Sequence, residues 1–245
     1  MYHYHTLNIE FETNGHKQVI TPVLLQDEQN TILVDCGYPH FISLLEEAFT
    51  QKGTTLDKIT KIIVTHHDMD HDGSLAELKQ KYPHVEVIAH ELEVPYIEGA
   101  KKSLRVEQAE STLDALSGEE KAGAEQFIHF LQSYEPVAVD REVAHGDKFP
   151  WCGGMEIVHT PGHMPGHISL YLSASKTMIA SDAVVIEEGK LNIANPQYTL
   201  DLDEAVRSVQ KLLDYDMEQL VCYHGGIFQG DLKQALKELI HTYTS

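Results

Sequence analysis

Short apolar runs alternate with polar turns along the chain, the pattern of β-strands separated by loops. In the N-terminal third, turn signals at Asn14-Gly15 and at 27–30 divide the runs, which predicts a β-meander. Apolar positions at helical spacing over 41–51, with Gly53 just beyond, predict the first helix. The strands expected in this third are about 7–11, 18–25 and 31–35.

The middle of the chain has the order strand, polar loop, helix and strand, at 61–65, 66–73, 74–81 and 85–89. The segment 91–135 that follows is long and charged, and its apolar residues recur at helical spacing. It predicts two helices joined near Ser117-Gly118 and inserted between strands. Such an insertion is either a lid over a site or an extra layer that closes the core, and the pattern favours neither.

Strand patterns return in the second half, interrupted by the Pro- and Gly-rich loop 160–167. The expected strands are 137–139, 155–159, 168–172, 177–180 and 219–223. Helical patterns occur at 202–213 and, after a last strand that runs into His224-Gly225-Gly226, at 232–243. Strands that alternate with helices in this way predict an α/β protein.

Composition narrows the class of protein. At 245 residues the chain can bury one sizeable core, and 42% hydrophobic with 23% charged residues is ordinary for a globular protein. No run approaches the roughly 18 apolar residues of a membrane span. The first ten residues lack the basic and then apolar pattern of a signal peptide, so we expect a cytoplasmic protein.

The chain is strongly acidic, with 38 Asp and Glu against 18 Lys and Arg and a formal net charge of -20. This charge repels phosphate backbones and acidic membrane surfaces, so we expect a small-molecule substrate and neither nucleic acid nor a membrane as partner. The three cysteines are widely spaced and form no CxxC, which predicts buried, reduced thiols. The sequence leaves the oligomeric state open. Its unusual count is 16 histidines, some of which are grouped.

Several polar loops place His or Asp directly after a short apolar strand, where a rigid sheet can hold a site. In the first of these loops, His66 and Asp68 are two residues apart and point the same way in extended chain. Both can therefore face one ion, while His67 points elsewhere. A turn then brings Asp70 and His71 round.

The same residue types recur later, with His163 in a Pro-Gly-His turn, Asp182 at a strand end and His224 before Gly-Gly. In this order the array resembles that of the metallo-β-lactamase superfamily, over about 34–226 and including the loop Asp35-Cys36-Gly37. The resemblance implies a four-layer αβ/βα sandwich that forms a single domain over the whole chain. It also implies a two-metal site along one edge of the paired sheets.

The resemblance further implies a set of metal ligands. The first metal is expected to be held by His66, Asp68 and His163, and the second by Asp70, His71 and His224, with Asp182 bridging the two. Asp70 is also assigned the catalytic role, and a hydroxide shared by the ions is the expected nucleophile. We expect two divalent ions per chain, with Zn favoured and Mn or Fe as alternatives.

Asp68 departs from the family's pattern, which usually has His at this place. With Asp68, Asp70 and Asp182 as ligands, the charges of the carboxylates, one hydroxide and two divalent ions cancel. A neutral cluster should be a weaker Lewis acid than the positively charged cluster that His would give. This predicts a higher pKa of the bridging water and a shift toward Mn or Fe.

Neighbouring histidines offer alternatives to two of these ligands. His67 could serve in place of Asp68, although the two-residue spacing from His66 favours Asp68. His159 and His167 could replace His163, but both fall inside predicted strands.

Residues that would support the metals are less clearly marked. Asp35 is expected to hold the metal-binding loop by hydrogen bonds, with a simple turn cap as the alternative. No general acid is evident, because three apolar residues follow Asp182 where lactonase relatives have Tyr. Tyr223 is expected to point away from the metals into packing. Loop tyrosines that could donate a proton are Tyr38, Tyr96 and Tyr198.

The favoured function is a metal-dependent hydrolase of an ester, thioester, lactone, β-lactam or related bond. Nuclease activity is disfavoured by the net charge of -20. The alternative is a di-iron oxidoreductase of the same fold, because flavin-linked relatives carry a carboxylate at the place of Asp68. A third interpretation is a metal-binding module without turnover.

Overall fold

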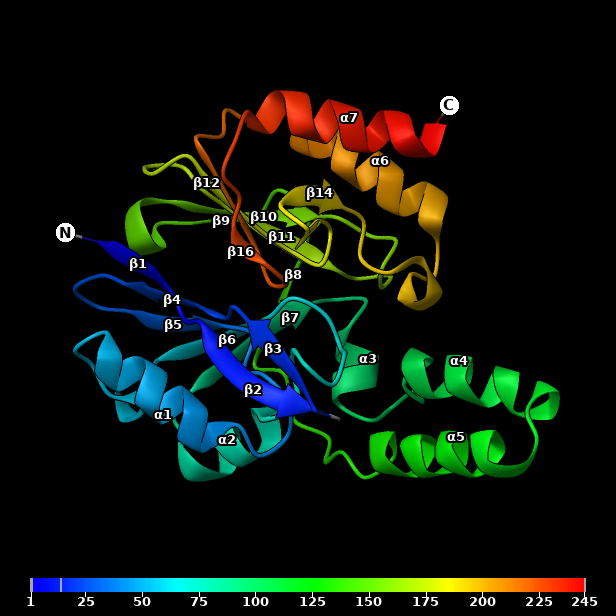
Figure 1. Ribbon diagram of the computed structural model, residues 1–245. Coiled ribbons are helices and arrows are strands. Elements are labelled where there is room, and N and C mark those ends of the chain that lie inside the picture. Colours follow the sequence, from blue (N-terminus) through cyan, green and yellow to red (C-terminus); the bar gives the residue numbers. More distant parts are fainter. Residues whose placement is uncertain (1, 14, 245) are drawn as a thin grey trace.

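The computed structural model describes residues 2–13 and 15–244 and has the four-layer αβ/βα sandwich that the sequence predicts (Figure 1). Two sheets face each other, and helices cover their outer faces. The helices on the first sheet are α1 (Ile42–Gln51) and α2 (Leu75–Lys81), and those on the second are α6 (Leu202–Leu212) and α7 (Leu232–Thr244). In the described part of the chain, no helix is both long and apolar enough to cross a lipid bilayer.

Each sheet has six described strands. The order across the first sheet is β1 (His3–Thr6), β4 (Val23–Gln26), β5 (Thr31–Val34), β6 (Lys61–Val64), β7 (Glu86–His90) and β8 (Arg141–Val143). The order across the second is β16 (Gly226–Ile227), β15 (Gln219–Cys222), β12 (Thr177–Ser181), β11 (Ile168–Leu172), β10 (Met155–His159) and β9 (Lys148–Phe149). Strands β5 to β8 run parallel, as do β12 and β15, so the loops that follow them gather at shared edges.

Two hairpins and a helical insertion lie outside the paired sheets. The hairpins are β2 (Ile9–Thr13) with β3 (His16–Ile20), and β13 (Val185–Glu187) with β14 (Lys190–Asn192). Between β7 and β8 the chain forms α3 (Val94–Ile97), α4 (Leu104–Thr112) and α5 (Gly118–Leu131). The last two helices pack against each other and project to one side of the sandwich (Figure 1), as the pattern over 91–135 predicts.

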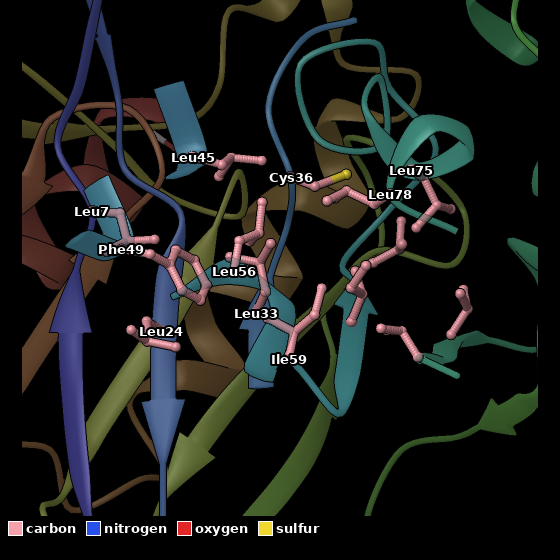
Figure 2. Packing of buried hydrophobic residues seen from close by; sticks show 14 of the residues in the cluster. Leu7, Leu24, Leu33, Cys36, Leu45, Phe49, Leu56, Ile59, Leu75 and Leu78 are labelled. Carbon is pink, nitrogen blue, oxygen red and sulfur yellow. The ribbon is translucent and has the colours of Figure 1, made fainter. Parts of the chain in front are cut away.

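The strands form because their apolar residues are buried on both faces of a sheet. In β5, Ile32 and Val34 point into the layer between the two sheets, while Leu33 points toward α1. Leu33 lies there with Phe49 of α1 and Leu24 of β4, as Figure 2 shows. Successive side chains of a strand point to opposite faces, so a continuous apolar run is what a central strand of a layered sandwich needs.

Each of the three apolar layers contains one cysteine. Cys36 lies between the first sheet and its helices (Figure 2), Cys152 lies between the sheets, and Cys222 lies between the second sheet and α6 and α7. All three are buried, as predicted, and none forms a disulfide in the structure. Burial raises the pKa of each thiol, to about 12 for Cys152.

Most predicted elements are confirmed within a residue or two, and two are wrong. The run predicted as one strand over 18–25 is divided between β3 and β4, because Pro22 has no N–H to give to a sheet ladder. The strand predicted at 137–139 lies instead at Arg141–Val143, and Val137 is buried against the core without joining the sheet. The turn predicted at Asn14 lies outside the described residues.

Candidate metal centre

One edge of the sandwich collects the side chains that the sequence marks as ligands. The loop after β6 supplies four of them, the loop between β10 and β11 one, and the ends of β12 and β15 one each. All seven lie together at this edge: His66, Asp68, Asp70, His71, His163, Asp182 and His224.

Asp182 lies at the middle of this cluster. Its Oδ2 atom is 3.5 Å from Nε2 of His71, 3.6 Å from Nε2 of His224 and 3.8 Å from Nε2 of His163. Burial alone raises the pKa of the carboxyl, but the facing rings of His224 and His71 hold this pKa well below its ordinary value of 3.8. The carboxylate is therefore ionised and faces ring nitrogens from both predicted ligand groups.

The cluster divides into groups in which the ligand atoms all lie within 4.8 Å of one another. The groups are His66, Asp68 and His163; Asp70, His71 and His224; and His66, His71 and Asp182. The first two are the two groups expected from the sequence, and the third joins them. The shortest distance between a carboxylate oxygen and a ring nitrogen of the cluster is 3.1 Å, between Oδ2 of Asp70 and Nε2 of His224.

Several buried atoms of the cluster have no hydrogen-bond partner among the described residues. They include Nε2 of His66, Nε2 of His71 and Oδ1 of Asp182. Buried polar atoms are nearly always paired, so these atoms require a further partner. A ring nitrogen and a carboxylate oxygen both donate lone pairs, so divalent cations fit the donor set.

The other ring nitrogens are held by neighbouring side chains. Nδ1 of His71 is 2.9 Å from Oδ2 of Asp35, and Nδ1 of His66 is 3.1 Å from Oγ1 of Thr65. Asp35 also accepts from the N–H and the hydroxyl of Thr65 and from the hydroxyl of Ser181. Asp35 therefore holds the loop after β6 by hydrogen bonds, as expected, and leaves Nε2 of His71 directed into the cluster.

Ring charges differ within the cluster. Burial holds the pKa of His66 well below 6.5, and the nearby rings of His71 and His163 lower it further. Burial also acts to lower the pKa of His71, but the carboxylates of Asp70 and Asp182 outweigh it and raise this pKa well above 6.5. In the absence of a bound ion, His66 therefore favours its neutral form and His71 its protonated form.

His67 does not join the cluster, which favours Asp68 in the choice that the sequence leaves open. The Nδ1 atom of His67 forms a short contact with Oε2 of Glu93, and its ring stacks on Tyr96 at 4.3 Å. Glu93 is fully buried and also accepts from the backbone N–H groups of His67 and Gly166. Glu93 thus joins the loop after β6 to the loop that carries His163.

The loop of His163 is fixed by close packing against α6. A Cβ atom at Gly162 would lie 2.2 Å from the backbone nitrogen of Ala205, so only glycine fits there. His167 is fully buried and accepts from the backbone N–H of Asp182. His159 instead contacts the carbonyl oxygen of Pro165. His163 is thus the histidine of this loop that reaches the cluster.

Asp68 has a partner that the sequence analysis missed. Arg105 of α4 is 4% exposed, and its Nε atom is 3.1 Å from Oδ2 and 3.3 Å from Oδ1 of Asp68. Its Nη2 atom makes a further, short contact with Oδ2. Burial alone raises the pKa of Asp68, but His163 and Arg105 hold it well below 3.8.

The cluster opens into a cavity of about 430 Å³. Besides five of the candidate ligands and Arg105, its lining consists largely of apolar and aromatic residues: Tyr38, Met69, Phe127, Val185, Ala194 and Tyr198. Of the loop tyrosines considered from sequence, Tyr38 and Tyr198 line this cavity. Tyr96 lines a different cavity, of about 250 Å³, which shares Asp68, Met69 and Arg105 with the first.

Tyr223 is buried in the core as expected, but it does not lie away from the cluster. Its ring packs on His71 with 3.9 Å between the ring centroids. Its hydroxyl donates to the backbone oxygen of Asp70 through a short contact. The expectation from strand alternation is wrong here because Tyr223 follows the last residue of β15, where the chain leaves the sheet.

Two supporting residues, Arg105 and Glu93, carry little signal in the sequence. Arg105 lies in the first turn of α4, where the helix dipole disfavours a cation, and this placement is a weak sign of a special partner. Glu93 lies in an acidic stretch that resembles a solvated surface. Both depend on contacts between segments that are distant in the chain.

The chain belongs to the metallo-beta-lactamase superfamily, whose family model matches residues 19–224. This membership agrees with the layered fold and with the His and Asp cluster at one edge of it. The protein is accordingly a metallo-hydrolase of this superfamily, and its substrate is not specified by membership.

Sequence relatives and solved structures agree with the assignment. The probable metallo-hydrolase YflN of Bacillus subtilis (strain 168) is 25% identical over 234 residues, which cover 91% of this chain and 86% of that protein. Hydroxyacylglutathione hydrolase of Rhizobium meliloti (strain 1021) is 25% identical over 163 residues, which cover 66% of this chain and 46% of that enzyme. A metallo-beta-lactamase family protein from Thermus thermophilus superposes with a TM-score of 0.77 at 21% identity, covering 98% of this chain and 79% of that one. At that identity the structural likeness concerns the fold.

Proposed function

We propose that the protein is a hydrolase that uses two divalent metal ions held by the seven clustered side chains. The observation that carries this proposal is the position of Asp182. One of its oxygens lies within 3.8 Å of the ring nitrogens of His71, His163 and His224. A carboxylate between rings of both ligand groups is suited to bridging two cations.

The proposed ligands follow the two groups. The first ion takes His66, Asp68 and His163, and the second takes Asp70, His71 and His224, with Asp182 shared. The mixture of imidazole and carboxylate donors suits Zn, with Mn or Fe as alternatives. Bound there, the ions would polarise a carbonyl oxygen of the substrate and lower the pKa of a water nucleophile.

The chain's own residues bind and orient the substrate. Asp70, the proposed catalytic aspartate, lines the cavity, so its carboxylate can accept a hydrogen bond from the attacking water. Tyr38 also lines the cavity, and burial followed by the charge of Asp70 raises its pKa well above 10. Its hydroxyl stays protonated at neutral pH and can donate to the substrate.

The cavity favours a neutral carbonyl compound with an apolar group. Among the described residues that line it, Arg105 is the single Lys or Arg, and each of its three side-chain nitrogens already has a hydrogen-bond partner. Bound ions would offset the charges of the cluster acids, but the lining adds the carboxylate of Glu187, which would repel a substrate with several negative charges. We therefore propose esters, thioesters and lactones with apolar acyl groups as substrates, and place phosphodiesters and glutathione thioesters lower.

A hydrolase screen on metal-defined protein tests this function. Metal-free protein is reloaded separately with Zn, Mn and Fe, and each form is assayed on short aryl esters, an acyl thioester, lactones, a β-lactam and a phosphodiester. We expect metal-dependent cleavage of the neutral esters or lactones. Loss of a residue that only hydrogen-bonds to a metal ligand typically costs about 10- to 100-fold. Asp182→Asn should reduce kcat/KM by more than this. Asp203→Asn, at an exposed position of α6, should leave it unchanged.

Other outcomes would contradict the proposal. A bound iron centre with a visible absorption band and no hydrolysis would favour oxidoreductase chemistry instead. Two bound metals with no turnover on any substrate would favour a binding module.

The cytoplasmic location and the exclusion of nucleic acid as a partner stay predictions.

A further inference from the structure

We propose that Arg105 is a positioning residue of the metal centre, which holds Asp68 in place and supplies the positive charge that an aspartate needs there. This inference rests on the proposed function, since it assumes that a cation binds to Asp68. It assigns to the helical insertion a role in building the centre.

The first step is that Arg105 holds Asp68 from a fixed position. The guanidinium uses two nitrogens, Nε and Nη2, to contact the carboxylate of Asp68. Its Nη1 atom is 2.5 Å from Oε1 of Gln108 and 3.0 Å from the backbone oxygen of Tyr198. The guanidinium also stacks over the Tyr198 ring, with its central carbon 5.2 Å from the ring centroid. The side chain is thus tied to α4, to the loop after β6 and to the far wall of the cavity.

The second step is that this pairing leaves Asp68 able to bind a cation. A carboxylate has about four lone-pair sites, and that of Asp68 accepts from three N–H groups, two of Arg105 and the backbone one of Met69, so one site remains for a cation. Oδ2 of Asp68 is 3.6 Å from Nε2 of His163 and so faces the first ligand group while Arg105 contacts it. Nε and Nη2 both contact Oδ2, and Nε also lies 3.3 Å from Oδ1, so the guanidinium restricts the orientation of the carboxylate more than a single contact would.

The total charge at the centre also depends on Arg105. No net charge results from two divalent ions, one hydroxide and the carboxylates of Asp68, Asp70 and Asp182. Arg105 is buried beside them and raises the total to plus one. A neutral histidine in place of Asp68 would give the same total without an arginine. The Asp68–Arg105 pair is therefore equivalent in charge to a single imidazole, and a count made from the ligands alone overstates how neutral this centre is.

The same contacts bear on whether the insertion is a lid. Arg105 lies at the start of α4, the first long helix of the insertion, and its partners Asp68 and Tyr198 lie outside the insertion. Moving α4 away would break a buried ion pair and leave Asp68 without its counter-charge, which is costly. The insertion is accordingly a fixed part of the centre at this end.

Metal binding, measured without any substrate, tests the proposal. The variants are Arg105→Met, Arg105→Lys, Asp68→His and the double variant Asp68→His with Arg105→Met. Arg207→Met, which removes an exposed arginine paired with Glu204 on α6, is the matched control. Metal stoichiometry comes from elemental analysis, and affinity comes from competition with a chromophoric Zn chelator. Thermal unfolding of each metal-free variant shows whether it is folded.

We expect Arg105→Met to weaken one of the two Zn sites by about 10- to 100-fold and to leave the other unchanged. Arg105→Lys should recover part of this loss, because it restores the charge without the fork. The decisive comparison is the double variant. With His at 68 no counter-charge is needed, so the double variant should bind Zn within about threefold of Asp68→His alone, a difference below about 1 kcal/mol.

Two results would overturn the inference while leaving the proposed function intact. One is wild-type affinity at both Zn sites in Arg105→Met. The other is a double variant that loses as much affinity relative to Asp68→His as Arg105→Met loses relative to wild type, since Arg105 would then not act through Asp68. Should wild-type protein bind no metal, the proposed function itself fails. If Arg105→Met does not fold, the comparison of Arg105→Lys with wild type decides, and equal affinities would count against the proposal.

Discussion

Two aspartates at opposite ends of β5 show how the same side chain serves two purposes. Asp27, in the turn before the strand, accepts hydrogen bonds from the backbone N–H groups of Gln29 and Asn30, two and three residues on, and from that of Cys152. Asp35, directly after the strand, has partners that are all distant in sequence, in the loop after β6 and at the end of β12.

The difference lies in what each carboxylate fixes. Asp27 mainly closes its own turn, which stabilises the chain locally. Asp35 is 1% exposed and fixes the ring of His71, so it acts on the site. The aspartate before β5, far from the cluster, therefore contributes mainly to stability. The aspartate after β5, beside the cluster, contributes mainly to the orientation of a candidate ligand. The predictions below test this distinction.

Removal of metal should produce the largest loss of stability. The structural change should be confined to the edge of the sandwich where Asp35 lies. A site filled at 100 times its dissociation constant stabilises the fold by about 2.7 kcal/mol, and chelation should remove this amount. Denaturant unfolding with and without chelator measures the change. Hydrogen exchange should show lost protection over 66–71 and unchanged protection at 27–30. Equal loss at both ends would contradict the distinction.

Asp35→Asn should reduce activity and metal affinity by about 10- to 100-fold. An Asn side chain can place its NH₂ group against the N–H or hydroxyl of Thr65, or against Nδ1–H of His71, so the ring is no longer held. Elemental analysis and kcat/KM measure the effect. Asp27→Asn is the matched control at the other end of the strand and should keep wild-type metal content. Matching losses in the two variants would show that Asp35 acts only through stability.

Asp27→Ala should have the smallest effect, a loss of about 1 kcal/mol in the free energy of unfolding with unchanged activity. This loss should also depend on pH. Burial raises the pKa of Asp27, but the N–H groups of Cys152, Gln29 and Asn30 together outweigh it, so the folded pKa lies below 3.8. The contribution is therefore complete above pH 3.8 and is lost as the pH falls through the folded pKa. Unfolding of metal-free wild type and variant from pH 7 to 2.5 measures it, and a constant difference across this range would contradict the expectation.

Much of the fold and the ligand cluster could be predicted because the signals are local. Polar residues directly after apolar runs, such as His66 after β6 and His224 after β15, mark candidate positions locally, and the resemblance to the metallo-β-lactamase superfamily implies which of them are ligands. Strand β10 was predicted with its observed bounds because it is continuous and bounded by turns.

What could not be predicted depends on contacts between distant segments. Arg105 is 37 residues from Asp68 and lies in a mostly polar helix, whose pattern does not mark this side chain as buried. Glu93 meets Gly166 across 73 residues. The strand predicted at 137–139 failed for the same reason, because Val137 packs against the core while the sheet ladder begins at Arg141. Local pattern identifies which residues are apolar but not which partner each one meets.

The distribution of the three cysteines gives the molecule a built-in set of reporters. Cys36, Cys152 and Cys222 each belong to a different apolar layer, and none has a disulfide partner. A thiol reagent can reach any one of them only when its own layer separates, even briefly. The order in which the three react therefore records the order in which the sheets and their covering helices come apart.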